Sequence, residues 1–455
     1  MASLDAVFKA YDIRGTVPDQ LDADVCRRIG AAFGRFAADA EASTGNGGPV
    51  RMVLARDMRP SGIELSAAFA EGAMEQGVDV VELGLASTDL LYFASGHLGV
   101  PGAIFTASHN PAGYNGIKMC LAGATPVGEE TGLGVIKQWA SGGLAPAPVS
   151  GSLSSADLLD AFADHVRSFV DTSLLAPLKI VADTANGMGG LVAPAVFGPL
   201  GFDVEYLYAE LDGTFPNHPA DPIQPENVAD LRARVLEVGA DIGLAFDGDA
   251  DRVFLIDEQA NIVSGSLTTA LVAKGLLAKH PGATVLHNLI CSKAVPEVIR
   301  EGGGKPVRTR VGHSFIKQVM AETGAIFGGE HSGHYYFRDN YRADSGLIAA
   351  LIVLEQLSVE HKPLSALLAP LDRYVASGEI NTKVHDPSAV IDNVAAAFAE
   401  LPQDRLDGLT IDAGSWWCNL RASNTEPLLR LNVEASNPEE LDDRVTALRT
   451  LIEKG

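Results

Sequence analysis

The sequence has few cysteines, few basic residues and no long apolar run, and each scarcity excludes a class of protein. Its four cysteines (Cys26, Cys120, Cys291 and Cys418) are far apart in 455 residues and form no C-x-x-C pair. This usage favours reduced, mostly buried thiols over a disulfide framework. No apolar run approaches the ~20 residues that a membrane-spanning helix needs. The first residues, MASLD, contain neither a basic nor an apolar signal region. We therefore expect a soluble cytoplasmic protein.

Basic residues are the second scarcity. Lys and Arg number 34 against 58 Asp and Glu, so the formal net charge is 34 − 58 = −24. A surface with this charge repels nucleic acid and anionic lipid, so we expect neither a nucleic-acid nor a membrane partner. No obligatory protein partner is indicated either. An anionic substrate would have to be held by a local basic pocket, which makes Arg and Lys within motifs informative.

Three segments share an apolar pattern that predicts strand, helix and strand. Each begins with a short apolar run, continues with helical periodicity, and ends with a glycine and a second apolar run. The segments are residues 50–83, 179–207 and 283–309. The pattern is typical of a parallel crossover, and its loose spacing suits related domains better than solenoid repeats. At ~100–200 residues per domain, the chain length predicts three or four domains.

Composition also indicates where the domains end. Residues 144–155 are rich in Pro, Ala, Gly and Ser and predict a linker, and a second boundary is expected near Glu258. The last part of the chain differs, with two strands and a closing amphipathic helix predicted at 415–421, 428–433 and 441–453. We predict an α/β fold of three similar mixed-sheet domains and a smaller C-terminal α+β domain around a central cleft. The predicted domains are residues 1–150, 151–258, 259–372 and 373–455.

The first motif with chemical potential is TASHNP at residues 106–111, directly after the apolar run 102–105. The hydroxyl of Ser108 in a tight turn can act as a nucleophile, and His109 and Asn110 can donate to oxyanions. The same residue types suit a polar turn that only caps a following helix. The motif alone does not decide between these interpretations.

The second motif is DGDADR at residues 247–252, after the apolar run 242–246. The carboxylates of Asp247, Asp249 and Asp251 can converge on one hard cation, with Mg²⁺, Mn²⁺ or Ca²⁺ favoured over Zn²⁺. A calcium EF-hand loop is disfavoured because Arg252 stands where the sharp turn requires Gly, and because the flanks predict strands. A solvated acidic turn is the other alternative, although its three carboxylates would repel one another. We predict a metal site.

The third motif is GGEHSGH at residues 328–334. Glu330 and Ser332 can bond neighbouring sugar hydroxyls, and the glycines permit a close approach of the backbone. A zinc site that uses His331 and His334 is an alternative, but it needs further ligands, and no H-E-x-x-H pattern is present.

The fourth motif is RASNTEP at residues 421–427, followed by Arg430. Hydroxyl and amide side chains, successive backbone N–H groups and an arginine fork suit a phosphate group. The alternative is a hairpin loop with an incidental arginine.

These four motifs, in this order, resemble the α-D-phosphohexomutase superfamily, and within it the phosphomannomutase/phosphoglucomutase group, over essentially the whole chain. The resemblance implies four domains around a deep cleft, with one motif from each. It implies that Ser108 is the phosphorylated serine, and that a phosphoserine oxygen joins the aspartates around Mg²⁺. Its other site positions are Glu330 and Ser332 for two sugar hydroxyls, and Arg421, Ser423, Asn424 and Thr425 for the non-reacting phosphate. Lys118 and His313 are implied for proton transfer, and Arg252 is implied as a catalytic residue that supports the transferring group. Tyr11, Arg14, His109 and Lys293 fall at supporting positions.

The implied activity is an isomerase that interconverts hexose 1-phosphate and hexose 6-phosphate through a phosphoserine and a hexose 1,6-bisphosphate. Its partners would be small hexose phosphates of mannose, glucose or both. His331 stands where some bifunctional members have Met and phosphoglucosamine mutases typically have Gln, so it favours mannose and glucose phosphates without choosing between them. Three alternatives stay open: a phosphoglucosamine mutase, a sugar phosphatase with Asp247 as nucleophile and Asp249 as acid/base, and a sugar-phosphate sensor.

Overall fold

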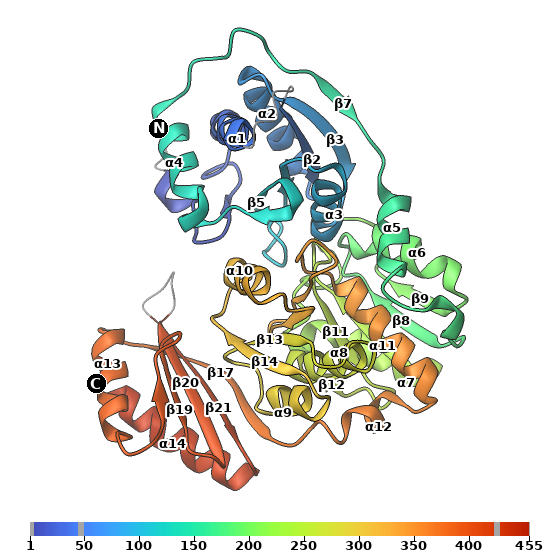
Figure 1. Ribbon diagram of the computed structural model, residues 1–455, viewed down its shortest axis with the longest axis vertical. Helices are drawn as coiled ribbons and strands as arrows, with labels where there is room; N and C mark the ends of the chain where they lie inside the picture. Colours follow the sequence, from blue (N-terminus) through green and yellow to red (C-terminus); the bar gives the residue numbers. More distant parts are fainter. Residues whose placement is uncertain (1–3, 44–49, 423–427, 455) are drawn as a thin grey trace. The chain divides into compact units, whose positions relative to one another are not determined.

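The structure, a computed structural model, describes residues 4–43, 50–422 and 428–454. It contains two compact units, and Figure 1 shows their elements coloured along the chain. The first unit comprises Met1–Ser264 and Ser332–Ser365, and the second comprises Gly265–His331 and Ala366–Gly455.

The first domain of the first unit is built on a seven-stranded mixed sheet. Its strand order is β1-β5-β4-β2-β3-β7, and β6 pairs with β5. The strands β2, β3, β4 and β7 run parallel, whereas β5 pairs antiparallel with both β1 and β4. The elements are β1 Ile13–Thr16, α1 Ala23–Ser43, β2 Arg51–Arg56, α2 Ser61–Glu75, β3 Asp79–Leu85, α3 Thr88–Leu98, β4 Gly102–Phe105, β5 Tyr114–Leu121, β6 Thr125–Pro126, α4 Leu133–Gly142 and β7 Leu153–Ser155.

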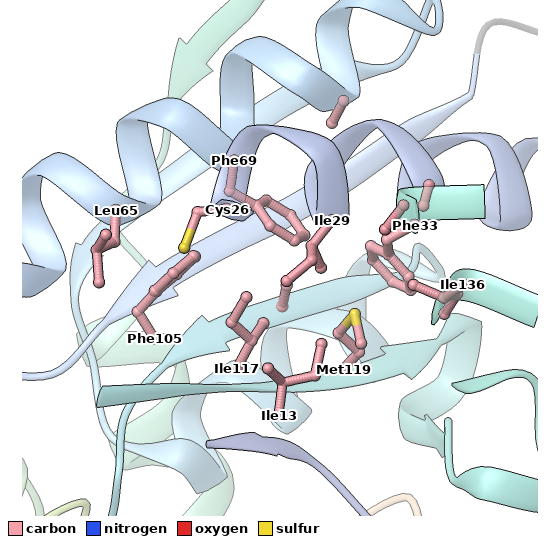
Figure 2. Packing of buried hydrophobic residues seen from close by; sticks show 14 of the residues in the cluster. Ile13, Cys26, Ile29, Phe33, Leu65, Phe69, Phe105, Ile117, Met119 and Ile136 are labelled. Carbon is pink, nitrogen blue, oxygen red and sulfur yellow. The ribbon is translucent and has the colours of Figure 1, made fainter. Parts of the chain in front are cut away.

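The core of this domain lies between its helices and the sheet. Figure 2 shows Phe33 of α1, Phe69 of α2 and Phe105 of β4 within this core. The ring centroids of Phe33 and Phe69 are 6.1 Å apart, and those of Phe69 and Phe105 are 5.6 Å apart. All three rings are fully buried, and each such burial contributes about 1.5–3 kcal/mol. This packing fixes β4, the strand that leads directly into the Ser108 motif.

Two glycines allow α1 and α2 to pack with their backbones in contact. A Cβ atom on Gly30 would lie 2.0 Å from the carbonyl oxygen of Phe69, and one on Gly72 would lie 1.9 Å from that of Arg27. Neither position has room for a side chain, so both glycines are required by the close approach.

The second domain of the first unit has a five-stranded mixed sheet in the order β12-β11-β10-β8-β9. The strands β9, β8 and β10 run parallel, and β10 continues into β11 as an antiparallel hairpin. The elements are α5 Leu159–Arg167, β8 Lys179–Asp183, α6 Gly189–Phe197, β9 Asp203–Leu207, α7 Ala229–Val238, β10 Ile242–Phe246, β11 Val253–Ile256 and β12 Ile262–Val263.

A later segment, residues 332–365, completes the first unit. It contains β16 Tyr335–Phe337 and the helix α11 Gly346–Glu360, whose residues are almost all buried. A helix that is apolar on every side is stable only when it is covered, and α11 packs against α5 and β11. The hydroxyl of Ser345 caps its N-terminus by accepting from the Ile348 backbone N–H at 3.3 Å.

The second unit begins with the parallel strands β14, β13 and β15, against which the helices α8, α9 and α10 pack. A smaller domain follows, with an antiparallel sheet in the order β17-β21-β20-β19-β18 and two helices whose side chains share its core. The elements are α8 Gly265–Lys279, β13 Thr284–Asn288, α9 Ala294–Glu301, β14 Lys305–Thr309, α10 His313–Thr323, β15 Phe327–Gly329, α12 Leu364–Leu368, β17 Val375–Lys383, α13 Pro387–Ala397, β18 Gln403–Asp404, β19 Leu409–Asp412, β20 Trp416–Ala422, β21 Leu428–Ala435 and α14 Pro438–Lys454.

The predicted fold class is confirmed. Each of the three predicted strand–helix–strand segments forms a parallel pair, β2 with β3, β8 with β9 and β13 with β14, and the C-terminal region is α+β. One detail differs, because the stretch read as a linker ends in β7, which pairs with β3. Its residues, Leu153, Ser154 and Ser155, are all exposed, and the pairing uses backbone groups that a single leucine in a short polar stretch does not reveal in the sequence.

Across the described residues, no helix combines the length and the apolar character that crossing a bilayer requires.

Candidate active site

Ser108 lies in a tight turn between two buried strands. The chain leaves β4 at Phe105 and enters β5 at Tyr114, so no helix follows the turn, and the interpretation of Ser108 as a helix cap is wrong. Ser108 has a φ of 48°, a left-handed conformation that is uncommon for a residue with a side chain. Its backbone N–H donates to the hydroxyl oxygen of Thr106 at 2.9 Å. Ser108 is only 5% exposed, so its hydroxyl is held inside the protein.

The three aspartates lie in the turn of the hairpin between β10 and β11. Both strands are fully buried and pair antiparallel, which excludes the helix–loop–helix of an EF-hand. A Cβ atom on Gly248 would lie 2.4 Å from the Ser108 carbonyl oxygen, so only glycine lets the two loops come this close. The sequence therefore brings the serine motif and the aspartate motif into direct contact.

The Ser108 hydroxyl is surrounded by groups of the aspartate loop. Its Oγ donates to Oδ2 of Asp247 at 2.7 Å, and Nη2 of Arg252 donates to the same Oγ at 3.2 Å. Arg252 also donates from Nε and Nη2 to Oδ2 of Asp247, at 2.9 Å and 2.8 Å. Nδ1 of His109 lies 3.2 Å from Ser108 Oγ and 2.7 Å from Arg252 Nη2. A buried hydroxyl thus faces a carboxylate and a guanidinium together.

Lys118 on β5 joins the other two aspartates. Its ammonium nitrogen lies 2.7 Å from Oδ2 of Asp249 and 2.7 Å from Oδ2 of Asp251. The hydroxyl of Thr88, at the start of α3, donates to the same Asp249 oxygen at 2.7 Å. Because Lys118 is only 8% exposed, these contacts are made in a low-dielectric environment where charge–charge attraction is strong.

The charges in this site shift one another's protonation. Burial lowers the pKa of His109 to about 2, with Arg252 adding to the effect, so the ring is neutral and its Nδ1 can accept from Arg252. Burial and the neighbouring carboxylates raise the pKa of Asp247 well above its usual range, against the pull of Arg252. Burial would also raise the pKa of Asp249, but the Lys118 ammonium and its hydrogen bond hold it below its ordinary value.

The aspartates fit a hard divalent cation. Their ligand atoms lie within 4.8 Å of one another, and all three side chains are buried. Among the described residues, Oδ1 of Asp249 and Oδ1 of Asp251 are buried carboxylate oxygens without a hydrogen-bond partner. Such oxygens are costly to bury unless an ion or donor reaches them. An all-carboxylate set of this kind is typical of Mg²⁺, Mn²⁺ or Ca²⁺ sites.

Asp251 also belongs to a second group of possible ligands, with His334 and Asp344. Nε2 of His334 lies 3.9 Å from Oδ1 of Asp251, and its Nδ1 lies 2.9 Å from the hydroxyl of Ser332. In the described part of the chain, neither group of potential metal ligands includes His331, which argues against a zinc site built on His331 and His334.

Two predicted residues from the N-terminal segment lie near the serine turn. Arg14, on β1, donates from Nη1 to Oδ1 of Asn110 at 2.6 Å, and its strand pairs with β5. Tyr11 precedes β1 and is partly exposed. Arg14 and Asn110 thus extend the row of polar groups from Ser108 towards the surface.

In the second unit, Glu330 follows β15 and is only 3% exposed. Its Oε1 accepts from the side-chain amide of Asn288 at 3.3 Å and from the Gly312 backbone N–H at 3.2 Å. The neighbouring His331 ring lies 3.0 Å from the Ser266 hydroxyl, and burial lowers its pKa. Glu330 is therefore a fixed carboxylate, and His331 is a neutral ring tied to the start of α8.

The basic residues of the second unit pair with acidic neighbours. Lys293 donates to Oδ1 of Asp412 at 2.9 Å and to the Gly414 carbonyl at 2.8 Å. Arg421 and Arg430 stand directly opposite each other on β20 and β21. Glu379 lies between them, with its oxygens 3.2 Å from Arg421 Nη2 and 3.7 Å from Arg430 Nη1. Two opposed guanidiniums form a basic pair that a phosphate would also satisfy.

Some predicted residues cannot be located. Ser423, Asn424 and Thr425 of the fourth motif lie outside the described residues. For His313, only the backbone is described, at the first position of α10.

The sequence reasoning missed several residues of this site. His334 was named only as a possible zinc ligand, and its place in the third motif does not indicate its contact with Asp251. The only sequence signal for Thr88 was that it is a polar residue after an apolar run. Arg59, whose guanidinium lies behind the Ser108 turn, resembled an ordinary surface arginine in the sequence.

Comparisons with known proteins agree over the whole chain. Four domain families match, described as the phosphoglucomutase/phosphomannomutase alpha/beta/alpha domains I, II and III and the C-terminal domain. They cover residues 5–142, 160–261, 264–374 and 379–451 respectively.

Individual relatives are similar along nearly their full length. A phosphomannomutase of Salmonella montevideo is 42% identical over 441 residues, which is 94% of each chain. A protein of Xanthomonas campestris pv. campestris described as phosphohexose mutases is 40% identical over 94% of each chain. The crystal structure of a phosphoglucomutase/phosphomannomutase family protein from Burkholderia thailandensis superposes with a TM-score of 0.90 at 34% identity, covering 100% of this chain and 99% of that one. The chain therefore belongs to the phosphoglucomutase/phosphomannomutase family, which the four sequence motifs predicted.

Proposed function

We propose that this protein is a phosphohexomutase that interconverts the 1-phosphates and 6-phosphates of mannose, glucose or both, with Ser108 as its phosphoryl carrier. The observation that carries this role is the environment of the Ser108 hydroxyl. It is buried, it lies 2.7 Å from Asp247 and 3.2 Å from the Arg252 guanidinium, and two carboxylates bound to Lys118 belong to the same loop. This arrangement can hold a highly charged phosphoserine where a lone surface serine could not.

The reaction consists of two phosphoryl transfers in opposite directions. In the first, the bond between phosphorus and Ser108 Oγ breaks, and a bond forms to the free hydroxyl oxygen of the hexose monophosphate. The hydroxyl proton passes to a protein base, for which we assign His313. Lys118, an ammonium between Asp249 and Asp251, is assigned as the donor of the proton that the released Ser108 oxygen takes up. A hexose 1,6-bisphosphate results. After the bisphosphate turns end over end, its other phosphoryl group returns to Ser108. The net reaction is an isomerisation.

Arg252 has two tasks in this scheme. It donates to Asp247 through two nitrogen atoms and to the Ser108 oxygen through one of them. Its guanidinium can therefore stabilise negative charge on the serine oxygen and on the transferring phosphoryl group. Neutral His109 accepts from Arg252 and helps to fix the direction of the guanidinium. Preorganised donors of this kind stabilise charge without reorganisation during the transfer.

Asp247, Asp249 and Asp251 would hold a divalent cation, which we assign as Mg²⁺. When bound, this ion neutralises charge on the phosphate oxygens. The two carboxylate oxygens without partners on Asp249 and Asp251, within the described residues, support its fit.

The substrate body would be held by residues away from Ser108. We assign Glu330 and Ser332 to two sugar hydroxyls, because a buried carboxylate with a fixed direction is a specific acceptor for them. Arg421 and Arg430, with Ser423, Asn424 and Thr425, are assigned to the phosphate that does not react. Lys293 and Tyr11 have supporting places. We further infer that the four domains end near residues 150, 258, 372 and 455.

The rival of an aspartyl-phosphate phosphatase is less compatible with the geometry. Asp247 would be its nucleophile, yet Oδ2 of Asp247 accepts from Ser108 and twice from Arg252, and Oδ1 accepts from the Arg252 backbone N–H at 3.2 Å. A carboxylate with both oxygens engaged by these donors is poorly placed to attack phosphorus.

The test compares the wild type with Ser108→Ala and with a control, Ser141→Ala, at an exposed serine of α4. Each protein is assayed with Mg²⁺, a trace of glucose 1,6-bisphosphate, and mannose 1-phosphate, glucose 1-phosphate or glucosamine 1-phosphate. We expect Ser108→Ala to lower kcat at least about 10⁴-fold, Ser141→Ala to leave it unchanged, and peptide mass spectrometry to find phosphate on Ser108.

Two outcomes would contradict the proposal. One is normal turnover by Ser108→Ala. The other is release of inorganic phosphate with the phosphoryl group on an aspartate. Faster turnover of glucosamine 1-phosphate than of either hexose phosphate would instead favour a phosphoglucosamine mutase.

A further inference from the structure

Arg59 is a fully buried arginine that lies behind the serine turn. It follows β2 and precedes α2, and its side chain is 0% exposed, as is that of its ion-pair partner Asp57. Burial lowers the pKa of Arg59 from its ordinary value, so this position is costly for a cation. An arginine is kept in such a place only when its donors are satisfied.

All of the guanidinium donors of Arg59 are used, and most of them hold the Ser108 turn. Nη2 donates to the carbonyl oxygens of Ser108 at 2.9 Å and Asn110 at 2.6 Å. Nη1 donates to those of Pro111 at 2.8 Å and Tyr114 at 3.0 Å. Four carbonyls of one loop therefore converge on a single side chain.

The remaining donor fixes the guanidinium itself. Nε of Arg59 donates to Oδ2 of Asp57 at 3.2 Å, while Oδ1 of Asp57 accepts from the Arg59 backbone N–H at 2.9 Å. Asp57 also receives a hydrogen bond from Thr106, whose hydroxyl oxygen accepts from the Ser108 N–H. The backbone of Ser108 is thus held at its carbonyl by Arg59 and at its N–H by Thr106. Asp57 contacts both of these residues and so links the two interactions.

The second domain closes the other side of Arg59. The ring of Phe215 lies 5.1 Å from the guanidinium carbon, within cation–π range. A Cβ atom on Gly213 would lie 2.6 Å from Arg59 Cα, so this segment packs directly on the Arg59 backbone. The guanidinium is therefore enclosed between the serine turn and the second domain.

The conformation that Arg59 holds is one that the turn would not favour by itself. Ser108 has a φ of 48°, and left-handed residues with side chains persist only where their surroundings determine them. The same conformation directs Oγ of Ser108 to Asp247 and Arg252. Loss of the four carbonyl bonds would let the turn relax and move Oγ away from both groups.

We infer that Arg59 is a positioning residue for phosphoryl transfer, which sets the direction of the Ser108 hydroxyl by holding four carbonyls of its turn. This inference rests on the proposed role of Ser108 as the carrier. Arg59 touches neither the reacting atoms nor the substrate. A planar guanidinium with five donors is needed for it, since a lysine offers three donors in a different geometry and cannot span the four carbonyls.

The experiment measures three properties of Arg59→Lys: kcat and KM with glucose 1-phosphate, the rate at which Ser108 gains phosphate from glucose 1,6-bisphosphate with Mg²⁺, and the thermal midpoint. We expect kcat and the phosphorylation rate to fall together by about 100-fold, because a small misplacement of a reacting atom has an effect of this size. KM should stay within about threefold, since the substrate-binding residues are untouched. Arg51→Lys, an exposed arginine on the same β2 strand, is the matched control.

The outcomes distinguish a failure of the proposed carrier function of Ser108 from a failure of the positioning role of Arg59. If wild-type Ser108 gains no phosphate from the bisphosphate, the proposed carrier function fails. If the wild type gains phosphate and Arg59→Lys gains it equally fast, only the inference about Arg59 is overturned. If Arg59 only stabilised the fold, Arg59→Lys would lower the thermal midpoint and the fraction of active protein. The kcat calculated per molecule that can be phosphorylated on Ser108 would then stay normal.

A second variant decides the matter if Arg59→Lys does not fold. Asp57→Asn keeps an acceptor for the Arg59 backbone N–H but removes the charge that fixes the guanidinium. We expect kcat and the phosphorylation rate to fall by about tenfold with KM unchanged. Unchanged kcat in folded Asp57→Asn would overturn the inference.

Discussion

The surroundings of Ser108 and the residues that we propose to hold the substrate differ in how their charges are buried and paired. Around Ser108, the side chains of Asp247, Asp249, Asp251 and Arg252 are at most 6% exposed, and that of Lys118 is 10% exposed. The contacts of Lys118 with Asp249 and Asp251, and of Arg252 with Asp247, are 2.7–2.8 Å long and lie within one unit of the structure. In the second unit, the side chains of Lys293, Arg421 and Arg430 are 25%, 12% and 32% exposed, and they pair with Asp412 or Glu379.

This difference suits two different tasks. Charge that develops during phosphoryl transfer is best met by groups that are already fixed and dry, because they need no reorganisation. A substrate phosphate has to bind, leave and return in the opposite orientation, so the groups that hold it need exchangeable partners. Glu379 can serve as that partner for Arg421 and Arg430. Substitutions in the first region should therefore change kcat, and those in the second should change KM.

Of the substitutions that test this difference, those in the aspartate loop are expected to change kcat the most. Asp251→Asn, or removal of divalent metal with a chelator, should lower kcat by about 10³-fold, because the charge of the phosphoryl group is then not neutralised. Steady-state kinetics with glucose 1-phosphate measure this, and added Mg²⁺ should restore only the chelated wild type. Asp160→Asn, at an exposed position of α5, is the control and should keep normal activity. Full activity of Asp251→Asn without metal would refute the assignment.

The second prediction concerns Arg421 and Arg430, which we propose to hold the phosphate that does not react. Arg421→Ala should raise KM by about tenfold and change kcat by less than about threefold, since it removes binding that is equal in the ground and transition states. Arg405→Ala, which breaks an exposed ion pair with Asp392 in the same domain, should change neither value. If Arg421→Ala lowered kcat and left KM unaltered, the proposed division between residues that govern kcat and residues that govern KM would be wrong.

A smaller effect of opposite sign is expected from Glu379→Gln. Without the carboxylate, a phosphate no longer competes for Arg421 and Arg430, so KM should fall by about two- to fivefold while kcat stays similar. Glu400→Gln, an exposed glutamate in the same domain, controls for the loss of one negative charge. An increase in KM would show that Glu379 orients the arginines rather than competing for them.

The smallest effect concerns the stability of the buried region beside the reaction centre. Burial raises the pKa of Asp89 to about 7, and its carboxyl oxygens accept from the hydroxyls of Ser87 and Ser345. The native state thus keeps a proton that the unfolded chain loses near its ordinary pKa of 3.8. The free energy of unfolding therefore falls as pH rises between these values.

Asp89→Asn should remove this part of the pH dependence. Between pH 5 and pH 8, thermal unfolding should show that the wild type loses on the order of 2 kcal/mol more stability than the variant does. Asp160→Asn should follow the wild-type profile. Parallel profiles for wild type and Asp89→Asn would mean that Asp89 is already ionised at pH 5.

Much of the fold was predictable because it depends on local apolar patterns. The runs that form β2, β8 and β13 are short and bounded by turn residues, and each is followed by helical periodicity and a second run. The pairing of β7 with β3 was not predictable, because this edge strand is only three residues long, is fully exposed and pairs through backbone bonds. The strands β17 to β19 were also missed, since the exposed, alternating β17 carries little apolar signal.

The candidate site was predictable to a similar degree. Ser108 and the aspartates stand in short motifs whose residue types limit their chemistry. The sequence could not show that Gly248 lets the two loops touch, or that Thr88 and His334 belong beside them, because these contacts join residues far apart in the chain.

The sequence by itself determined the family and the fold class, and it supplied the candidates that we propose for phosphate, metal and sugar. This was possible because each motif is a short continuous segment, so its residue types can be recognised without knowing which distant segments contact it. Only the tertiary structure decided how those groups are poised. The pKa shifts, the partnerless oxygens of Asp249 and Asp251 among the described residues, and the enclosure of Arg59 all arise from burial and from contacts between distant segments. Burial strengthens electrostatic interactions by removing water, and no local pattern in a sequence records where water is excluded.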